Sequence, residues 1–167
     1  MIILYLAFVH IAAQQNTHYI PLVRTPPSGR IGASMACIKS KETFLIFGGS
    51  LETTYYDELW FYNKDYHIWE EVLLSTDSSP SPRIYFGSFV SALSEKFYIF
   101  GGNSYQGLKN DFWEFDPKSL KWSYLDTINP PSVRHAFSFT SFIKDGNEIF
   151  IIFGGETTSG NANGLFM

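Results

Sequence analysis

Three short apolar runs along the chain each end in a pair of glycines. They read TFLIFGG at 43–49, KFYIFGG at 96–102 and FIIFGG at 150–155. Runs of this length without polar alternation are typical of β-strands that are buried on both faces. Paired glycines at the end of a strand favour backbone conformations with positive φ, which other residues adopt at a cost. The pattern therefore predicts an all-β chain with three equivalent strands.

The glycine pairs share one spacing, since Gly48, Gly101 and Gly154 lie 53 residues apart. Trp69 and Trp122 have the same offset. The other repeated positions are an arginine (Arg30, Arg83 and Arg134), the second glycine of each pair (Gly49, Gly102 and Gly155) and an aromatic residue (Trp60, Trp113 and Phe166). The third arginine precedes its glycine by 20 residues rather than 18, and we place the two extra residues at an Asp145-Gly146 turn. A period near 50 is typical of the blade of a β-propeller.

The second unit shows four strands. We expect strand a at 86–93, strand b at 96–100, strand c at 111–115 and strand d at 121–125. Four short antiparallel strands make one blade. We interpret the four tryptophans as core residues that fill the space between blades, and the three arginines as structural residues that hydrogen-bond to nearby carbonyls. A ligand role for the arginines is the alternative. The pairs Asp57-Glu58 and Asn110-Asp111 are interpreted as turn and strand-start residues.

The first thirteen residues form a separate segment. Ile2 to Ala13 is apolar and is followed by polar residues, and about 20 residues are needed to span a bilayer. The segment is typical of a signal peptide, although it lacks a basic start. We therefore expect a secreted, cell-surface or endomembrane-lumen protein, with a cytoplasmic location as the alternative if the leader is retained.

The repeat resembles the Kelch family over about residues 19–167. The resemblance rests on an arginine, then Gly-Gly, then the sequences DELW and NDFW, then tryptophan nine residues later. It departs from the family where Gly-His often follows the arginine, because this chain has Ile31-Gly32, Ile84-Tyr85 and His135-Ala136. The resemblance implies a Kelch-type β-propeller fragment with two full four-stranded blades and about half of a third. It also implies an interaction module, since most Kelch propellers are of that kind.

Sequence motifs of catalysis are missing from the chain. A net charge of −4 without a Lys/Arg run argues against a nucleic-acid partner. His18, His67 and His135 share no repeat position, and we predict no catalytic residue, metal or cofactor. The single cysteine, Cys37, is interpreted as a buried strand residue. The alternative is a fragment of a propeller enzyme, of the galactose oxidase or sugar epimerase kind, with its active site outside this chain.

The connections between strands b and c, and between strands d and a, are expected on one face. We predict that this face binds a protein partner. The b–c connections are interpreted as loops at 50–56, 103–109 and 156–162. Tyr55, Tyr56 and Tyr105 are candidate anchors there, with covering of the blade edges as the alternative.

The expected organisation follows from the repeat. It is a signal peptide at 1–13, a strand d of a missing last blade within 14–29, and repeats at 30–82, 83–133 and 134–167, the last truncated. We interpret Tyr19 to Val23 as that strand. Propellers close with about 4 to 8 blades, so we predict that this chain alone associates or stays partly unfolded.

Overall fold

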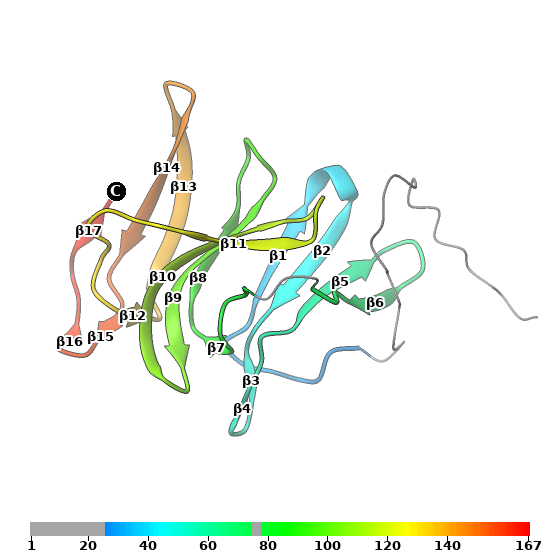
Figure 1. The fold of residues 1–167 in the computed structure, drawn as a ribbon, viewed down its shortest axis with the longest axis horizontal. Coiled ribbons are helices and arrows are strands. Elements are labelled where there is room, and N and C mark those ends of the chain that lie inside the picture. The colour runs from blue at the N-terminus through cyan, green and yellow to red at the C-terminus, as the bar shows by residue number, and fades with distance from the viewer. Residues whose placement is uncertain (1–25, 75–77) are drawn as a thin grey trace, which may run out of the picture.

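The computed structural model describes residues 26–74 and 78–167. The signal peptide and the strand predicted at 19–23 lie outside these residues. The described chain is all-β apart from one short 3-10 turn, η1 (Lys39–Lys41). Its strands form five antiparallel sheets, and the three that make the blades follow one another across the molecule (Figure 1).

The first blade is a four-stranded sheet in the order β1-β2-β5-β6. Its strands are β1 (Ser34–Ile38), β2 (Thr43–Phe47), β5 (Leu59–Asn63) and β6 (Ile68–Glu71). The order follows the chain, so each strand pairs with the next one of this sheet. This is the simple antiparallel meander expected of a propeller blade.

The second blade repeats this meander. It consists of β8 (Gly87–Val90), β9 (Phe97–Ser104), β10 (Gly107–Asp116) and β11 (Lys121–Leu125). Strand β11 has the bounds that the sequence predicts for strand d. The third blade has three strands, β13 (Ser138–Lys144), β14 (Asn147–Phe153) and β17 (Leu165–Phe166). The Asp145-Gly146 turn joins β13 to β14, and both of its residues have positive φ, as a two-residue hairpin turn requires.

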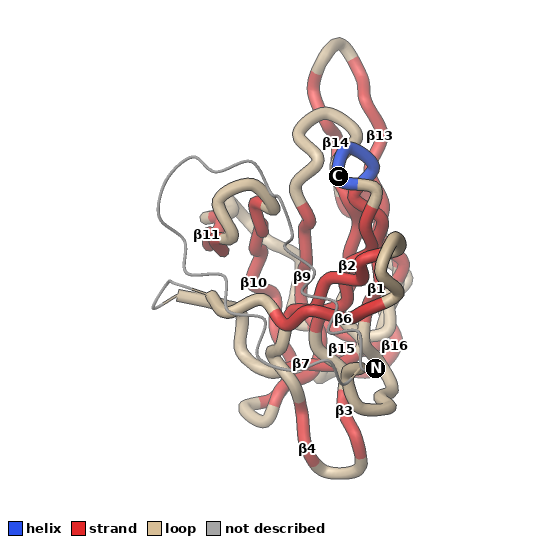
Figure 2. Tube along the Cα trace, turned by 90° about the vertical axis from the view of Figure 1, so that its right-hand side faces the viewer, coloured by secondary structure: helices blue, strands red, loops and turns tan. Residues whose placement is uncertain are grey.

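The predicted b–c loops are hairpins instead. The pair β3 (Ser50–Leu51) and β4 (Thr54–Tyr55) replaces the first loop, and β15 (Glu156–Thr157) with β16 (Gly160–Asn161) replaces the third. In the second unit β9 continues to Ser104 and β10 begins at Gly107, so the ladder runs on through a register shift. The hairpin strands β3, β4, β15 and β16 are short and mostly polar, so they lack the apolar alternation by which a strand is identified in a sequence. Figure 2 shows the β3–β4 hairpin projecting from the molecule.

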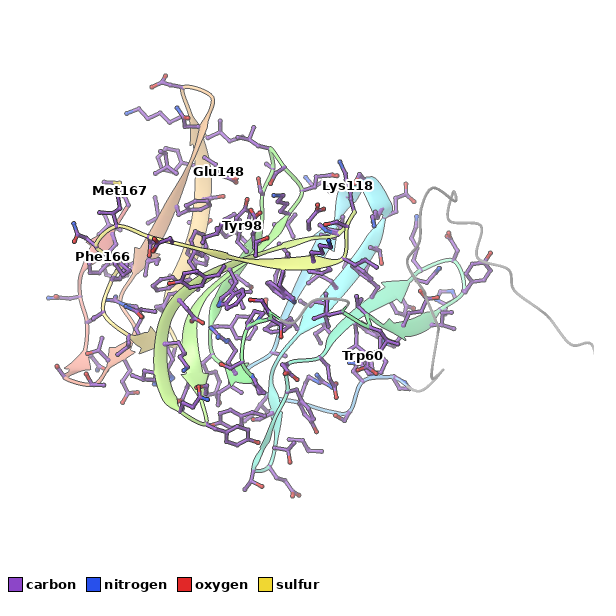
Figure 3. All side chains as sticks on the ribbon, in the orientation of Figure 1. Trp60, Tyr98, Lys118, Glu148, Phe166 and Met167 are labelled. Carbon is purple, nitrogen blue, oxygen red and sulfur yellow. The ribbon has the colours of Figure 1, made fainter. Side chains whose placement is uncertain are left out.

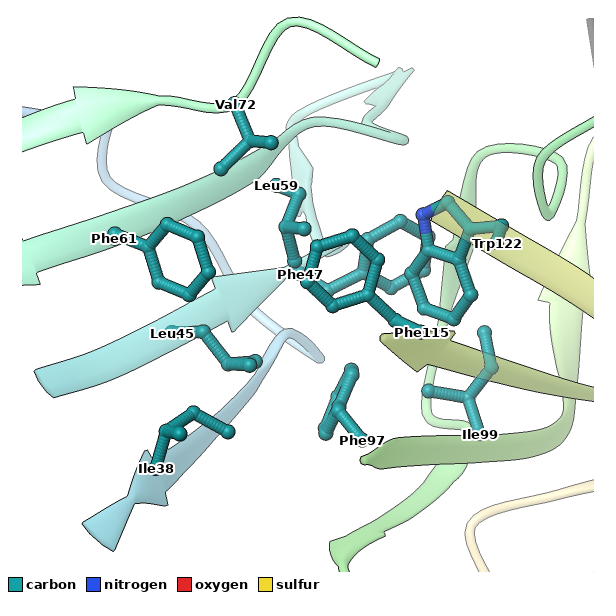
Figure 4. Packing of buried hydrophobic residues seen from close by; sticks show 10 residues of the cluster. All are labelled: Ile38, Leu45, Phe47, Leu59, Phe61, Val72, Phe97, Ile99, Phe115 and Trp122. Carbon is teal, nitrogen blue, oxygen red and sulfur yellow. The ribbon is translucent and has the colours of Figure 1, made fainter. Parts of the chain in front are cut away.

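Two apolar clusters hold the blades together. The first joins blades 1 and 2 and contains ten buried residues: Ile38, Leu45, Phe47, Leu59, Phe61, Val72, Phe97, Ile99, Phe115 and Trp122 (Figure 4). The second joins blades 2 and 3 around Tyr98, Phe100, Phe112 and Ile152. Because blade 2 is covered on both sides, Phe97 to Phe100 of β9 are all buried. In β2 and β14 burial is incomplete, since within residues 26–74 and 78–167 each outer blade is covered by another blade on one side only.

Not every predicted core residue is buried. Trp60 and Trp122 are buried, whereas Trp69 and Trp113 are only half-buried. Cys37 is exposed, so its interpretation as a buried strand residue is wrong. The reason is strand alternation: Ile38 points to the first cluster, and its neighbour Cys37 therefore points to the opposite face of blade 1, which no other blade of the described residues covers.

Candidate protein-interaction face

Each repeat begins with an arginine, and the segments that start with it, at 30–32, 83–85 and 134–136, are called the entrances of the blades. Arg83 has no exposed side-chain surface, and it donates to the Gly101 carbonyl oxygen at 2.9 Å. Its Nη1 and Nη2 also donate to the two carboxylate oxygens of Asp111, each at 2.7 Å. Asp111 accepts a further bond from the indole nitrogen of Trp113. A planar guanidinium and a carboxylate form such a bidentate pair with little freedom of orientation, so strand c is fixed against the start of its blade.

The first blade has the same arrangement with a glutamate. Arg30 donates to the Gly48 carbonyl oxygen at 3.1 Å and to Glu58 at 2.9 Å, and Trp60 donates to the same Glu58 oxygen. Glu58 and Asp111 are therefore the counter-ions of the arginines, a role that the sequence interpretation missed. The signal was present, because each acid follows its arginine by 28 residues.

The third blade lacks this carboxylate. Arg134 is buried and donates to the Gly154 carbonyl oxygen at 2.8 Å, but Gly164 occupies the position of the acid. The ring of Phe166 lies 4.6 Å from the guanidinium carbon and takes the place of the missing charge through a cation–π contact. Burial lowers the pKa of Arg134.

The second glycine of each pair lies against the entrance of its own blade. Gly49, Gly102 and Gly155 have φ values of 94°, 96° and 92°, a range that other residues rarely adopt. A Cβ added to Gly102 would lie 2.9 Å from the Ile84 carbonyl oxygen, and one added to Gly155 would lie 2.8 Å from that of His135. Glycine at these positions therefore lets the end of strand b pass close to the entrance backbone.

The same entrances join neighbouring blades through the backbone. The amide of Tyr85 donates to the Gly32 carbonyl oxygen, and that of Ala136 donates to the Tyr85 carbonyl oxygen. All three residues have positive φ, which costs nothing for Gly32 but is rare for a bulky residue such as Tyr85. These bonds connect blade 1 to blade 2 and blade 2 to blade 3. The first b–c hairpin starts beside them, because the Gly49 amide donates to the Arg83 carbonyl oxygen.

The loop face is the side of the molecule that carries the b–c hairpins and the strands β7 (Arg83–Ile84) and β12 (Arg134–His135), which begin the second and third units. These elements lie together at the lower side of Figure 1. The turns between β1 and β2, β8 and β9, and β13 and β14 lie at the opposite side.

Tyr55 and Tyr105 meet on the loop face. Their rings stack with centroids 4.6 Å apart and planes 22° from parallel. The Tyr105 hydroxyl donates to the Thr53 carbonyl oxygen at 2.9 Å and accepts from the Tyr55 amide at 2.6 Å. Tyr105 of blade 2 thus fastens the β3–β4 hairpin of blade 1, while the residue remains 63% exposed.

Tyr56 does not join this pair. Its ring lies 4.3 Å below the guanidinium carbon of Arg30 and is half-buried. The residue therefore covers the arginine of the first blade. Ile31, Leu51 and Tyr85 are exposed on the loop face, and the sequence interpretation did not select them.

The described residues contain no group of three or more potential metal ligands. His135 Nε2 lies 3.3 Å from Glu156 Oε2, and its Nδ1 is buried without a hydrogen-bond partner. His67 is exposed in its turn and shares a hydrogen bond with the Tyr62 hydroxyl, while His18 lies outside the described residues. In the same ranges, 26–74 and 78–167, no helix has the length and apolar character needed to cross a bilayer.

Comparison with known proteins agrees with this architecture. The model of the KLHDC2/KLHL20/DRC7 Kelch-repeats domain matches residues 5–167, and the match begins within the predicted leader. Tip elongation aberrant protein 1 of Schizosaccharomyces pombe is 33% identical over 97 residues, which are 55% of this chain and 8% of that protein. Human Kelch domain-containing protein 2 is 32% identical over 83 residues, 47% of this chain and 20% of that protein.

An enzyme is also among the relatives. The N-(sulfonatooxy)prop-2-enimidothioate sulfolyase of Thlaspi arvense is 27% identical over 104 residues, 62% of this chain and 29% of that protein. The aligned parts therefore span less than a third of each of these relatives.

Consecutive four-stranded meanders, each fastened by a buried arginine at its entrance, define a β-propeller scaffold. Together with the match over 5–167, they show that the chain belongs to the Kelch-repeat family.

Proposed function

We propose that this chain is a non-catalytic interaction module, secreted or at the cell surface, that binds a protein partner through its loop face. The observation that carries the proposal is the set of exposed apolar side chains on that face: Ile31, Leu51, Tyr85 and Tyr105. Exposed aromatic and aliphatic groups on a rigid frame are typical of binding surfaces. The stacked tyrosines and the backbone bonds between entrances supply that rigidity.

The proposal is tested with a matched pair of variants. Leu51→Asp changes an exposed leucine of the β3–β4 hairpin, and Leu93→Asp changes an exposed leucine at the turn before β9, on the opposite side. A partner retained by the parent chain and by Leu93→Asp, but lost with Leu51→Asp, supports binding at the loop face. Equal loss with both variants, or with neither, contradicts it.

The location is tested separately. The apolar segment at 2–13 supports entry into the secretory route, where it would be removed. N-terminal sequencing of the expressed product is expected to show a start after residue 13. A cytosolic product that retains Met1 would exclude secretion and leave the interaction proposal standing.

A second candidate follows from the relative that is named as a sulfolyase. In this reading the chain is part of a propeller enzyme, and His135 and Glu156, whose Nε2 and Oε2 atoms lie 3.3 Å apart on the loop face, are the candidate catalytic residues. Turnover of N-(sulfonatooxy)prop-2-enimidothioate by the parent chain, lost in His135→Ala, would favour the enzyme. We favour the interaction module, because the described residues show an exposed apolar surface rather than converging polar groups.

A further inference from the structure

The exposed charges of the loop face are all of one sign. Among the described residues of the entrances and the b–c hairpins, with the residue that follows each hairpin, three charged side chains are exposed, and all are acidic: Glu52, Asp57 and Glu156. The entrance arginines have almost no exposed side-chain surface. Lys109 is half-buried and donates to the Gln106 side chain. A partner that approaches this face therefore meets negative charge.

The opposite side, formed by the tight turns, is basic instead. Lys118 lies on this side (Figure 3). The exposed lysines at these turns are Lys39, Lys41, Lys64, Lys118 and Lys144, and the exposed acids there are Glu42, Asp65 and Asp145. The lysines outnumber the acids. The negative charge of the loop face is therefore a property of that face, and the net charge of the chain does not account for it.

Tyr85 places an aromatic ring between the entrances of blades 1 and 3. Its φ is 54°, and the equivalent residues, Gly32 and Ala136, have φ values of 66° and 53°. A bulky residue rarely adopts this conformation, so the entrance favours a small one. Blade 2 nevertheless carries a tyrosine that is 40% exposed. Because Tyr85 belongs to the middle blade, its exposure does not arise from an uncovered outer face. Strained residues of this kind are concentrated at functional sites.

An imidazole and a carboxylate lie next to this tyrosine. The rings of Tyr85 and His135 have centroids 6.0 Å apart. Oε2 of Glu156 lies 3.3 Å from Nε2 of His135, and the Glu156 side chain is 62% exposed. His135 also pairs with Glu156 between β12 and β15, so the backbone fixes the carboxylate on the blade 3 side of the tyrosine. An aromatic ring attracts a cation to its face, and a carboxylate accepts its hydrogen bonds.

On the basis of the proposed interaction function, we propose that the loop face binds a basic segment of its partner, with an arginine side chain held between the Tyr85 ring and the Glu156 carboxylate. Arginine fits better than lysine, because its planar guanidinium stacks on an aromatic ring and also pairs with a carboxylate through two hydrogen bonds. On the β3–β4 hairpin, the exposed Glu52 follows the exposed Leu51. A segment in which arginines alternate with apolar residues matches this combination of acidic and apolar groups.

Two short peptides test the preference for positive charge. The probes are Ac-Gly-Arg-Leu-Arg-Gly-amide and the same peptide with citrulline, which has the shape of arginine without its charge, at both arginine positions. Calorimetric titration of the full chain is expected to show roughly 5-fold tighter binding of the arginine peptide. This advantage should shrink in about 0.5 M salt, because salt screens exposed charges. Equal affinity for the two peptides, or no detectable binding of the arginine peptide at about 1 mM, would overturn the proposal.

A matched pair of neutral variants locates the charge that matters. Glu156→Gln removes a carboxylate from the loop face, and Glu42→Gln removes one from the opposite side, where the Glu42 side chain is 70% exposed. Glu156→Gln is expected to weaken binding of the arginine peptide about 2- to 5-fold and to leave the citrulline peptide unaffected. Glu42→Gln should change neither. Equal weakening by the two variants would mean that only net charge counts, and the arginine site would be wrong.

Substitutions of Tyr85 test the contribution of the ring. Tyr85→Ala is compatible with the fold, since Ala136 occupies the same position in blade 3. It should bind the arginine peptide about 2- to 5-fold more weakly, because the cation–π contact is lost. Tyr85→Phe keeps the ring and should bind like the parent. Parental affinity in Tyr85→Ala, with a thermal melt that shows it folded, would contradict the site, and so would equal weakening by alanine and phenylalanine.

Failure of the arginine site can be told from failure of the interaction function. Loss of a partner with Leu51→Asp but not with Leu93→Asp supports binding at the loop face, whatever the charge of the partner. If that pattern holds while the arginine and citrulline peptides bind alike, the loop face binds a partner without a basic segment. In that case only the arginine site is excluded, and the interaction function stands.

Discussion

Arg83 and Asp111 form a bidentate pair, in which both nitrogen–oxygen distances are 2.7 Å and the arginine side chain is completely buried. The pair joins two positions 28 residues apart in sequence, the entrance of blade 2 and its strand c. Asp111 also accepts from the Trp113 indole, so one carboxylate orients two large side chains. The geometry explains why arginine and tryptophan recur in the repeat at a fixed distance.

Removal of this carboxylate is expected to be costly. Asp111→Ala leaves the buried Arg83 without its counter-ion, which typically costs about 3–5 kcal/mol. Asp111 keeps 23% side-chain exposure, so water replaces part of the lost interaction and we expect about 3 kcal/mol. Urea unfolding of the parent and the variant measures the difference. Lys121→Ala, on the exposed side of β11, serves as a control with little expected effect.

The same pair predicts a dependence on pH. Burial raises the pKa of the Asp111 carboxyl, but the hydrogen bonds and charge of Arg83, together with the Trp113 bond, outweigh it, so the pKa is lowered. The unfolded chain has an Asp pKa of about 3.9. The stabilisation is therefore complete above that pKa and is lost as the pH falls through it toward the lower native pKa. We expect the difference in unfolding free energy between the parent and Asp111→Asn to shrink between about pH 5 and pH 3. A constant difference would contradict this assignment.

Tyr105 offers a local test of the hairpin contact. Tyr105→Phe keeps the stacked ring but removes the hydroxyl that accepts from the Tyr55 amide and donates to Thr53. A hydrogen bond contributes about 0.5–1.5 kcal/mol, so exchange of the Tyr55 amide should quicken by roughly 2- to 12-fold. Global unfolding should change little, since Tyr105 is exposed. Unchanged exchange at Tyr55 would show that the hydroxyl does not hold the hairpin.

The tryptophans are expected to differ in their effect on stability. Trp122 is buried among Phe47, Phe97 and Phe115, so Trp122→Ala should cost roughly 3–5 kcal/mol. Trp113 is half-buried, and Trp113→Ala should cost less than Trp122→Ala. Thermal melts of the two variants rank them. Both residues pack on the cluster between blades 1 and 2, so the reverse ranking would mean that burial does not determine their contributions to it.

The blade register was predictable from sequence because it depends on residues with distinct chemistry. The Gly-Gly pairs mark the end of each strand b, where Gly48 and Gly101 have positive φ and an added Cβ would lie within 2.9 Å of a backbone oxygen of the next blade. The apolar runs before them mark the strands. These features are local in sequence, so one chain suffices to find them.

The exposure of individual side chains was less predictable. Cys37 and Val90 occupy equivalent positions, yet Val90 packs against the first cluster and Cys37 is exposed. The difference arises from the neighbouring blade and not from the residues themselves. The clamp formed by Tyr105 was also hidden, because its partners Thr53 and Tyr55 lie about 50 residues earlier in sequence.

The third blade allows the arginine pair to be restored. Gly164 occupies the position of Glu58 and Asp111, so Gly164→Asp places a carboxylate beside the buried Arg134. An added Cβ would lie 3.0 Å from the Phe166 ring, which ends a side chain that can turn aside. Since Arg134 is already buried, charge-assisted hydrogen bonds worth about 1.5–3 kcal/mol should stabilise the chain by at least about 1 kcal/mol after the cation–π contact is lost. Gly164→Asn is the matched control, equal in shape but without charge, and should give little or no gain. Urea unfolding measures both variants, and equal stabilities for Asp and Asn at this position would show that Arg134 does not require a counter-ion.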